Sequence, residues 1–364
     1  MFKVATTKLR STWESLPDSS LWQTLNLQIV KNQSLKPYNT FGLDESCAWF
    51  VAVSTLEELH DALLLAKKEN LPVLILGGGS NMLITKRFEG LVIKISNSGK
   101  ELVSLTKSEV TLKVAAGENW HSLVLFTLDQ GWYGLENLSL IPGNVGAAPM
   151  QNIGAYGAEA RNSIVEVEYW DRDAEELKTL SAEECRFGYR ESIFKHELKE
   201  RAVIWSVTFR LSLFPTIKAD YGDIRKLLTD WGIQDPEPKD VSRAVIQIRQ
   251  SKLPDPAELG NAGSFFKNPV VEMLVYETIK KSYPEVPLYV VDATHVKIPA
   301  GWLIETAGWK GKDLGSHGVH KKQALVLVNY GNAKGNEILA LSKDIQADVK
   351  DKFGISLQAE VNVI

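Results

Sequence analysis

The chain has 364 residues, of which 44% are hydrophobic and 24% charged, as expected for a globular protein with a sizeable core. Its 41 Lys and Arg against 45 Asp and Glu give a formal net charge of -4, and no basic block marks a surface for nucleic acid or anionic membrane. It has no apolar run long enough for a membrane span, no signal-peptide core and only Cys47 and Cys185, so we expect a cytoplasmic protein without membrane partners.

The first part of the chain alternates between helix and strand after an N-terminal extension. Residues 1–33 contain only a marginal amphipathic helix, "LWQTLNLQIV", and we expect a peripheral or disordered extension there. Ser54 and Glu57 stand in capping-box spacing before a helix that runs up to a buried strand over residues 71–76. The next predicted elements are strands over 91–95 and 110–117, a helix over 118–131 closed by Gly131, strands over 164–170 and 203–211, and between them a short helix capped by Ser181.

The pattern changes after about residue 212. "FPTIKADYGD" reads as a linker or loop, so we place a domain boundary between residues 212 and 213. The later predicted elements are helices over 240–252 and 270–282, a strand over 324–329, a long helix over 336–353 ended by Gly354, and a last strand over 355–363.

Three glycines, Gly77, Gly78 and Gly79, follow the strand over 71–76 and precede Ser80 and Asn81. A tight turn explains most such clusters. Backbone N–H groups without Cβ crowding can also close on phosphate oxygens, and this stretch alone leaves both interpretations open. The dinucleotide fingerprint G-x-G-x-x-G fails at Met82, and no P-loop motif occurs.

A second glycine loop, "GLENLSLIPGNVGAAPMQNIGAYG" over residues 134–157, keeps a long backbone ribbon free of bulky side chains. Its small and amide residues include Gly143, Gly146, Asn152, Gly154 and Gly157. Two such loops in one domain suit a dinucleotide whose pyrophosphate and ring system are both held largely by main chain.

A series of motifs from about Ser34 onward resembles the UDP-N-acetylenolpyruvoylglucosamine reductase family. They are "YNTFG", "PVLILGGGSNML", "LIPGNVGAAPMQNIGAYG", "ECRFGYRESIFK", "KLPDP", "GNAGSFFKNP", "AGWLIE" and "HKKQALVLVN". The resemblance implies an α+β fold, with an FAD-binding domain of the vanillyl-alcohol-oxidase (PCMH) type over 34–212 and an α/β substrate-binding domain over 213–364. It also implies that NADPH reduces non-covalently bound FAD, and that enolpyruvyl-UDP-N-acetylglucosamine is then reduced to UDP-N-acetylmuramate for peptidoglycan synthesis.

The resemblance also implies which residues hold the cofactor. Gly77 to Asn81 would hold the FAD pyrophosphate. The remaining cofactor contacts would come from Gly143, Gly146, Asn152, Gly154, Ala155 and Tyr156. Ala147 and Ala148 stand where some relatives carry serines, which puts the tuning of the cofactor in question more than its binding.

Arg190, Ser264 and Glu360 match the family's catalytic arginine, proton donor and glutamate. Hydride addition to an enolpyruvyl group leaves a carbanion beside a carboxylate, which needs a fixed cation and then a proton. An always-charged guanidinium suits the first task, and a serine suits the second if its alkoxide is stabilised, for which Lys252 is a candidate. From the residues alone, the favoured interpretations are a structural ion pair for Arg190 and a turn or cap for Ser264.

In the predicted last strand, alternation places Glu360 on the polar face with Ser356 and Gln358. An exposed carboxylate on an edge strand is the alternative to a catalytic one. In the catalytic role, burial or like charge should raise the pKa of Glu360.

Tyr221 and Asn268 match substrate-contacting positions of the family, and the segment around Tyr221 suggests its first type, in which a loop folds over the substrate. His317 and His320 lack further spaced ligands, so we expect no metal, and we expect a monomer. The rivals are another FAD-dependent oxidoreductase of the same fold, such as an oxidase, and a non-catalytic sensor of FAD or a UDP-sugar. A hydrolase is disfavoured because no G-x-S-x-G motif occurs.

Overall fold

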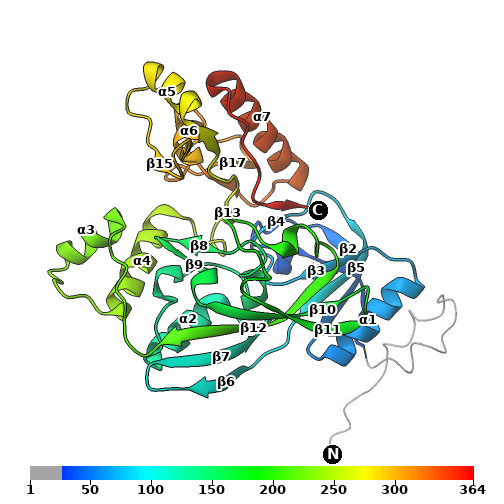
Figure 1. The fold of residues 1–364 in the computed structure, drawn as a ribbon. Coiled ribbons are helices and arrows are strands. Elements are labelled where there is room, and N and C mark those ends of the chain that lie inside the picture. The colour runs from blue at the N-terminus through cyan, green and yellow to red at the C-terminus, as the bar shows by residue number, and fades with distance from the viewer. Residues whose placement is uncertain (1–26) are drawn as a thin grey trace, which may run out of the picture.

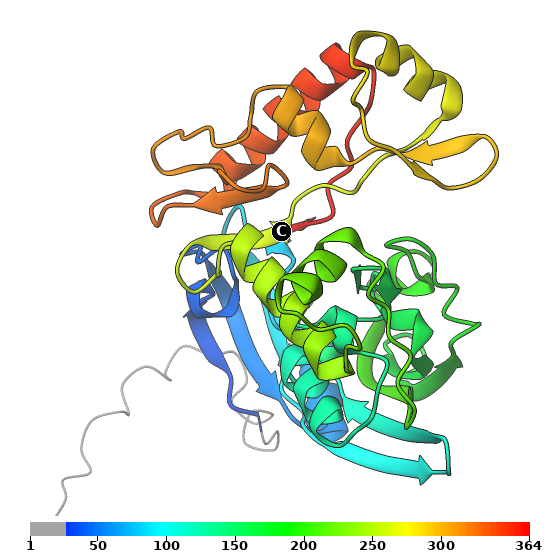
Figure 2. The ribbon, with the colours of Figure 1, turned by 90° about the vertical axis from the view of Figure 1, so that its left-hand side faces the viewer.

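The computed structural model describes residues 27–364 and consists of two units (Figures 1 and 2). The N-terminal unit contains a four-stranded and a five-stranded sheet with helices α1 to α4, and the C-terminal unit contains two three-stranded sheets with α5, α6 and α7. Most of the predicted helix "LWQTLNLQIV" lies outside the described residues. Residues 30–33, which we expected within the extension, belong to the first strand.

The four-stranded sheet has the order β1-β2-β5-β3, with β2, β5 and β3 parallel and β1 antiparallel to β2. Its strands are β1 (Val30–Ser34), β2 (Ser46–Val53), β3 (Val73–Leu76) and β5 (Phe88–Ile95). Because β3 is an edge strand, it is less buried than predicted, and only Leu76 is fully covered.

Helix α1 (Leu56–Lys68) connects β2 to β3. Its capping box forms one residue later than predicted: the N-cap is Thr55, whose side chain accepts the N–H of Glu58. Ser54 still donates its N–H and hydroxyl to the Glu58 carboxylate. The helix itself is as predicted, since the correction concerns only which neighbouring hydroxyl begins it.

The five-stranded antiparallel sheet has the order β11-β10-β12-β7-β6. Its strands are β6 (Lys100–Leu105), β7 (Glu109–Ala115), β10 (Ile164–Asp171), β11 (Glu176–Ser181) and β12 (Ala202–Ser212). Helix α2 (Trp120–Asp129) lies between β7 and β10 in the chain. Gly131, with a φ of +73°, follows the helix and ends it as predicted. One continuous apolar core joins both sheets with α1 and α2.

The short helix predicted after Ser181 is only a single turn. Ser181 and Glu184 make the reciprocal hydrogen bonds expected of a capping box, and the Cys185 N–H reaches the Ser181 carbonyl. Arg186 then has a φ of +47°, which a right-handed helix cannot continue through.

Helices α3 (Gly222–Asp230) and α4 (Pro238–Lys252) pack against each other through one apolar cluster. The cluster contains Ile224, Leu228, Val241, Ala244, Val245 and Ile248. Sequence reasoning placed α4 but read the start of α3 as a loop. Within the N-terminal unit, α4 packs against the short helix η2 (Glu136–Leu138). The proposed division at residues 212 and 213 stays a prediction.

The C-terminal unit has the sheets β13-β18-β17 and β14-β16-β15. Its strands are β13 (Gly260–Ser264), β14 (Val270–Glu272), β15 (Tyr289–Val290), β16 (His295–Lys297), β17 (His317–Val319) and β18 (Val326–Asn329). Its helices are α5 (Met273–Ser282), α6 (Ala300–Thr306) and α7 (Gly335–Phe353). Gly354, with a φ of +71°, ends α7 as predicted.

The terminal segment, residues 354–364, returns from α7 to the N-terminal unit (Figure 1). The prediction of a strand over 355–363 is wrong. Only β19 (Asn362–Val363) is a strand, paired in parallel with β4 (Met82–Leu83), and Ala359 forms one isolated bridge with Phe266. The segment therefore bridges the two units instead of extending one sheet.

Among the described residues, no helix is long and apolar enough to cross a membrane.

Candidate active site

Arg190 lies in a tight turn. Gly188 and Glu191 exchange backbone hydrogen bonds of 2.9 and 3.3 Å around Tyr189 and Arg190. Arg190 has a φ of +58°, the left-handed region that glycine usually supplies at this place in a turn. Such a conformation costs a non-glycine residue about 1–2 kcal/mol, so the surroundings must hold it.

The guanidinium of Arg190 is anchored on both sides. Its Nη2 donates to the Gly154 carbonyl at 2.8 Å, and its Nε lies 3.0 Å from Oε1 of Glu360. A Cβ on residue 154 would come within 3.1 Å of Nη1, so Gly154 leaves the room that this side chain occupies. The contact of the buried Nε with Glu360 is an ion pair, and among the described residues Nε has no second polar partner.

Glu360 is buried, with 11% of its side chain exposed. Its N–H donates to the Phe265 carbonyl at 2.8 Å, and its carboxylate accepts from Gln151 Nε2 at 3.1 Å. Asn81 donates to the Glu360 carbonyl and to Gln151, which connects the first glycine loop to the second at this point. Burial raises the pKa of Glu360, while Arg190 and two lysines oppose that rise.

The expectation that Glu360 follows a simple alternation is wrong. Ala359 is exposed and Glu360 turns inward, because the backbone here pairs with Phe265 and Phe266 rather than with a regular strand. Its raised pKa agrees with the expectation for a catalytic carboxyl.

Ser264 ends β13 and is exposed. It directly precedes Phe265, whose carbonyl holds the Glu360 N–H. Its hydroxyl has no hydrogen-bond partner within residues 27–364, so it is free to turn toward a ligand. The structure thus brings Arg190 and Glu360 into contact and sets Ser264 in the neighbouring backbone.

The two glycine loops approach each other closely. A Cβ on Gly78 would lie 2.7 Å from Cα of Gly143, and one on Gly79, whose φ is +65°, would lie 1.9 Å from the Tyr38 carbonyl oxygen. Ser80 adds a hydrogen bond of 3.1 Å to the Pro142 carbonyl. Close packing therefore explains Gly78 and Gly79, a reason that differs from both the tight turn and the phosphate site considered from the sequence.

Gly77 differs, because a Cβ there would meet nothing within 4 Å. This open backbone fits a ligand held by main chain beside the loops. Arg249 adds a cation that sequence reasoning missed. Its Nε donates to the Leu140 carbonyl, burial lowers its pKa, and within the described chain it has no carboxylate partner.

Other predicted cofactor residues have partners within the protein. Asn152 is fully buried, donates to Glu159 and Gly188, and accepts from Arg161, which makes it an internal anchor of the second loop. Ala155 lies in a short hairpin strand, β8 (Gly154–Ala155).

Tyr156 and Tyr221 lie together, with ring centroids 5.4 Å apart in an edge-to-face arrangement. Burial, aided by a hydrogen bond with Tyr289 of the C-terminal unit, raises the pKa of Tyr221 to about 12. Lys252 pairs with Asp223 on α3, so its observed partner is not Ser264. These contacts group Tyr221 and Lys252 at the α3–α4 side of the site.

Asn268 accepts the Ala300 N–H at 2.9 Å, which satisfies the first turn of α6, and also hydrogen-bonds Tyr189. Lys297 lies 4.2 Å from the centroid of the Tyr189 ring. This part of the C-terminal unit therefore touches the residue next to Arg190.

Two further lysines near Arg190 were not predicted, although both stand inside the quoted motifs. Lys195 donates to the Arg190 carbonyl at 3.1 Å, and Lys267 lies 2.6 Å from the Glu191 carboxylate. Each lies a few residues from a predicted catalytic residue, in "GYRESIFK" and in "FFKNP", and this proximity could have predicted that they lie near the site.

His317 is hydrogen-bonded to Ser316, and neither His317 nor His320 has acidic or cysteine neighbours suited to a metal. In residues 27–364 no group of three or more His, Cys, Asp or Glu side chains could hold a metal ion.

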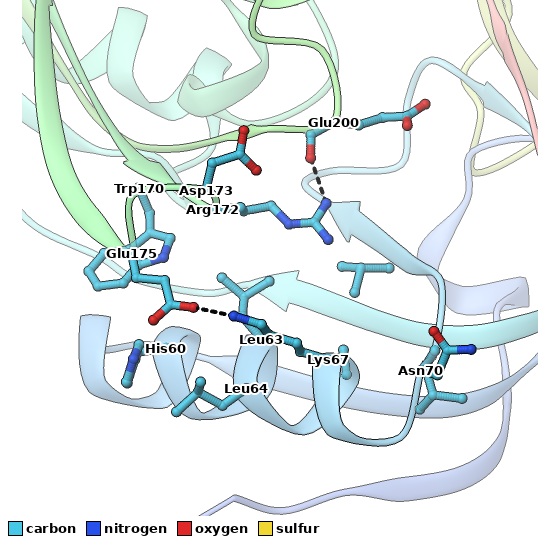
Figure 3. Close-up of a pocket in the computed structure, with 13 residues that line it drawn as sticks. His60, Leu63, Leu64, Lys67, Asn70, Trp170, Arg172, Asp173, Glu175 and Glu200 are labelled. Atoms are coloured by element: carbon cyan, nitrogen blue, oxygen red, sulfur yellow. Dashed lines mark hydrogen bonds and ion pairs between the residues drawn. The ribbon is translucent and has the colours of Figure 1, made fainter.

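A pocket of about 600 Å³ lies elsewhere, between α1 and the turn that joins β10 to β11 (Figure 3). Its two cations have partners: Lys67 pairs with Glu175 at 2.8 Å, and Arg172 donates to the Glu200 carbonyl. None of the predicted site residues lines it.

Two family models match separate parts of the chain. Residues 47–180 match the FAD binding domain family, and residues 255–364 match the family described as UDP-N-acetylenolpyruvoylglucosamine reductase, C-terminal domain. A solved UDP-N-acetylenolpyruvylglucosamine reductase from Thermus caldophilus shares the fold, with a TM-score of 0.63 and 23% identity over 93% of this chain and 98% of that one. The expected α+β architecture with an FAD-binding domain is confirmed.

Curated relatives match over nearly the whole chain. The UDP-N-acetylenolpyruvoylglucosamine reductase of Flavobacterium johnsoniae is 52% identical over 93% of this chain and 100% of its own length. That of Chromobacterium violaceum is 49% identical over 92% of this chain and 99% of its own. The chain therefore belongs to the UDP-N-acetylenolpyruvoylglucosamine reductase family.

Proposed function

We propose that this protein is an FAD-dependent reductase that converts enolpyruvyl-UDP-N-acetylglucosamine to UDP-N-acetylmuramate for peptidoglycan synthesis. The observation that carries the proposal is the buried contact between Arg190 and Glu360, 3.0 Å apart, where both glycine loops and the terminal segment meet. NADPH serves as the co-substrate. The protein works as a cytoplasmic monomer.

FAD, when bound, supplies the hydride chemistry that no side chain of this protein can supply. The residues that would hold FAD non-covalently belong to the two glycine loops. In the first, Gly77 to Asn81 would hold the pyrophosphate, with open backbone at Gly77. In the second, Gly143, Gly146, Gly154, Ala155 and Tyr156 would line the rest of the cofactor, and Asn152 anchors this loop from inside.

Arg190 stabilises the charge that develops during the reduction. Hydride addition to the terminal carbon of the enolpyruvyl C=C bond leaves the electron pair on the carbon next to the carboxylate. A guanidinium that cannot lose its proton stabilises this dianion, and its fixed position avoids reorganisation in the transition state. Its Nη2 and Nε face the Gly154 carbonyl and Glu360, and these contacts fix the guanidinium in place for that purpose.

Ser264 gives the proton that completes the reduction. The O–H bond breaks, a C–H bond forms at the carbon next to the carboxylate, and the serine oxygen keeps the negative charge until it is reprotonated from solvent. Its exposed hydroxyl without an internal partner supports this role. Lys252 contacts Asp223, so its proposed contribution is to the substrate rather than to the alkoxide.

Glu360 orients Arg190 and adjusts the charge of the site. The pKa of Glu360 is raised by burial, so the neutral acid is more accessible than for an exposed glutamate. A neutral Glu360 would leave the full charge of Arg190 for the substrate and could donate a hydrogen bond. Tyr221 and Asn268 bind the nucleotide and diphosphate parts of the substrate, with the segment around Tyr221 folding over them.

Anaerobic reduction tests this function. The purified protein should show an oxidised flavin band, NADPH should bleach it, and enolpyruvyl-UDP-N-acetylglucosamine should restore it without oxygen. A band that bleaches and stays bleached would remove the proposed substrate. It would favour instead an oxidase of the same fold, if oxygen restores the band with turnover, or a non-catalytic sensor.

A further inference from the structure

The turn that carries Arg190 needs support from outside itself. A non-glycine residue with φ of +58° is strained, and its two turn hydrogen bonds include one of 3.3 Å. In this conformation the backbone carbonyl of Arg190 faces Lys195. The ammonium of Lys195 donates to that carbonyl at 3.1 Å.

Lys195 is held in place by its own local structure. It is the last residue of the short helix η5 (Ile193–Lys195), which Ser192 caps by accepting the Phe194 N–H. Ser192 also donates to the Met150 carbonyl at 2.6 Å, and Phe194 is buried. The base of Lys195 is therefore fixed to the second loop and to the core, while its ammonium points back at the turn.

The ammonium of Lys195 binds the Arg190 carbonyl because the neighbouring carboxylate of Glu191 is bound by other residues. The nearest carboxylate is Glu191, at 3.9 Å from the ammonium. That carboxylate is already engaged by Lys267 at 2.6 Å and by His196 at 2.7 Å. Lys195 thus makes a short contact with a backbone carbonyl and only a long one with an acid.

We propose that Lys195 is a positioning residue for this reaction: its ammonium holds the strained turn in which Arg190 presents its guanidinium to Glu360 and the substrate. The inference rests on the proposed function. Lys195 does not contact the reacting atoms in this role. It orients Arg190, which does.

The charge of Lys195 reaches the site as well. The charged and titratable groups that act on or face Glu360 are Arg190, Lys195, Lys267 and Tyr189. Arg190, Lys195 and Lys267 lower the pKa of Glu360 against the rise caused by burial. Loss of the Lys195 charge should therefore raise the pKa of Glu360 further, whichever of its protonation states the reaction needs.

The test uses the holoenzyme with three variants: Lys195→Met, Lys195→Arg, and Lys199→Met as the matched control on an exposed lysine of the same loop. Flavin bleaching by NADPH and anaerobic flavin reoxidation by enolpyruvyl-UDP-N-acetylglucosamine are measured separately across pH. In Lys195→Met, reoxidation should slow by about ten- to a hundredfold, the effect of a small misplacement of a catalytic group. Its Glu360-dependent pH limb should move to higher pH, while bleaching by NADPH stays unchanged.

Lys195→Arg, which keeps a charged donor, should recover most of the reoxidation rate and the pH limb, and Lys199→Met should match the unaltered protein. Equal reoxidation by Lys195→Met and the unaltered protein would overturn the inference alone. An equal slowing of both half-reactions without a pH shift would also overturn it, since that is general damage. If the unaltered protein is not reoxidised by the substrate, the proposed function itself fails. Should Lys195→Met not fold, Lys195→Gln replaces it under the same criteria.

Discussion

Nε of Arg190 lies 3.0 Å from Oε1 of Glu360, so a turn of the N-terminal unit and the terminal segment share one buried ion pair. Each side chain is mostly covered, with 19% and 11% exposed. Removing one partner of a buried pair leaves the other charge uncompensated, which costs more than the pair itself contributes. The contact therefore fixes the terminal segment and Arg190 together.

Arg190→Lys should slow flavin reoxidation by the substrate by about a hundred- to a thousandfold, as for loss of one donor to a developing oxyanion. Lysine keeps the charge but has no planar fork to contact Gly154 and Glu360 together. Bleaching by NADPH should be unaffected. The control is Arg186→Lys, an exposed arginine paired with Glu197. Equal reoxidation rates in the two variants would exclude a catalytic role for Arg190.

Ser264→Ala should slow protonation of the reduced substrate by about a hundred- to ten-thousandfold, the range for loss of a general acid. Rapid-mixing absorbance of the reoxidation half-reaction checks this, with Ser282→Ala on the exposed end of α5 as the control. Because Ser264 is exposed and its hydroxyl has no internal partner among the described residues, stability should not change. A normal rate in Ser264→Ala would assign the proton to another donor.

Glu360→Gln should change how stability depends on pH. The pKa of Glu360 is raised in the folded protein, so its neutral form is favoured on folding, and the stability it contributes is lost as pH rises through that folded pKa. Glutamine cannot ionise, so this loss should disappear. Urea unfolding at about pH 5 and about pH 8 should show a smaller decrease for Glu360→Gln than for the unaltered protein. A larger decrease in the variant would mean that the pKa is lowered instead.

Local signals predicted the parts of the fold that depend on neighbouring residues. Gly354 ends α7 and Gly131 follows α2, both with positive φ, because a glycine at a helix end needs no distant partner. The site is different. Alternation assigned Glu360 to the polar face of a strand. Its burial depends instead on Phe265, which follows β13, and on Gln151 in the second loop.

Motif spacing could name Arg190 and Ser264 but not their surroundings. The positive φ of Arg190 and the contact of Lys195 with its carbonyl depend on how the turn packs on η5. The periodicity of the sequence does not predict such packing. Helix α3 was missed for a related reason: its apolar face is defined by α4 rather than by the main core. Long-range packing therefore accounts for most of the differences.

Gly79→Ala and Gly77→Ala should separate packing from ligand binding in the first loop. Alanine at 79 must adopt a φ of +65° and place its Cβ 1.9 Å from the Tyr38 oxygen, which destabilises the fold by more than the about 1–2 kcal/mol of the backbone conformation alone. Alanine at 77 meets no protein atom within 4 Å, so its apoprotein should unfold as the unaltered one does.

If the open backbone at Gly77 faces FAD, however, Gly77→Ala should still lower FAD affinity, because the added methyl group occupies space meant for the cofactor. Urea unfolding of the apoproteins and titration with FAD, followed by quenching of flavin fluorescence, measure the two effects independently. Normal stability with weakened FAD binding at residue 77, and lost stability at residue 79, would divide the glycines between the two roles. Unchanged FAD affinity in Gly77→Ala would leave packing and the turn as the whole explanation of the cluster.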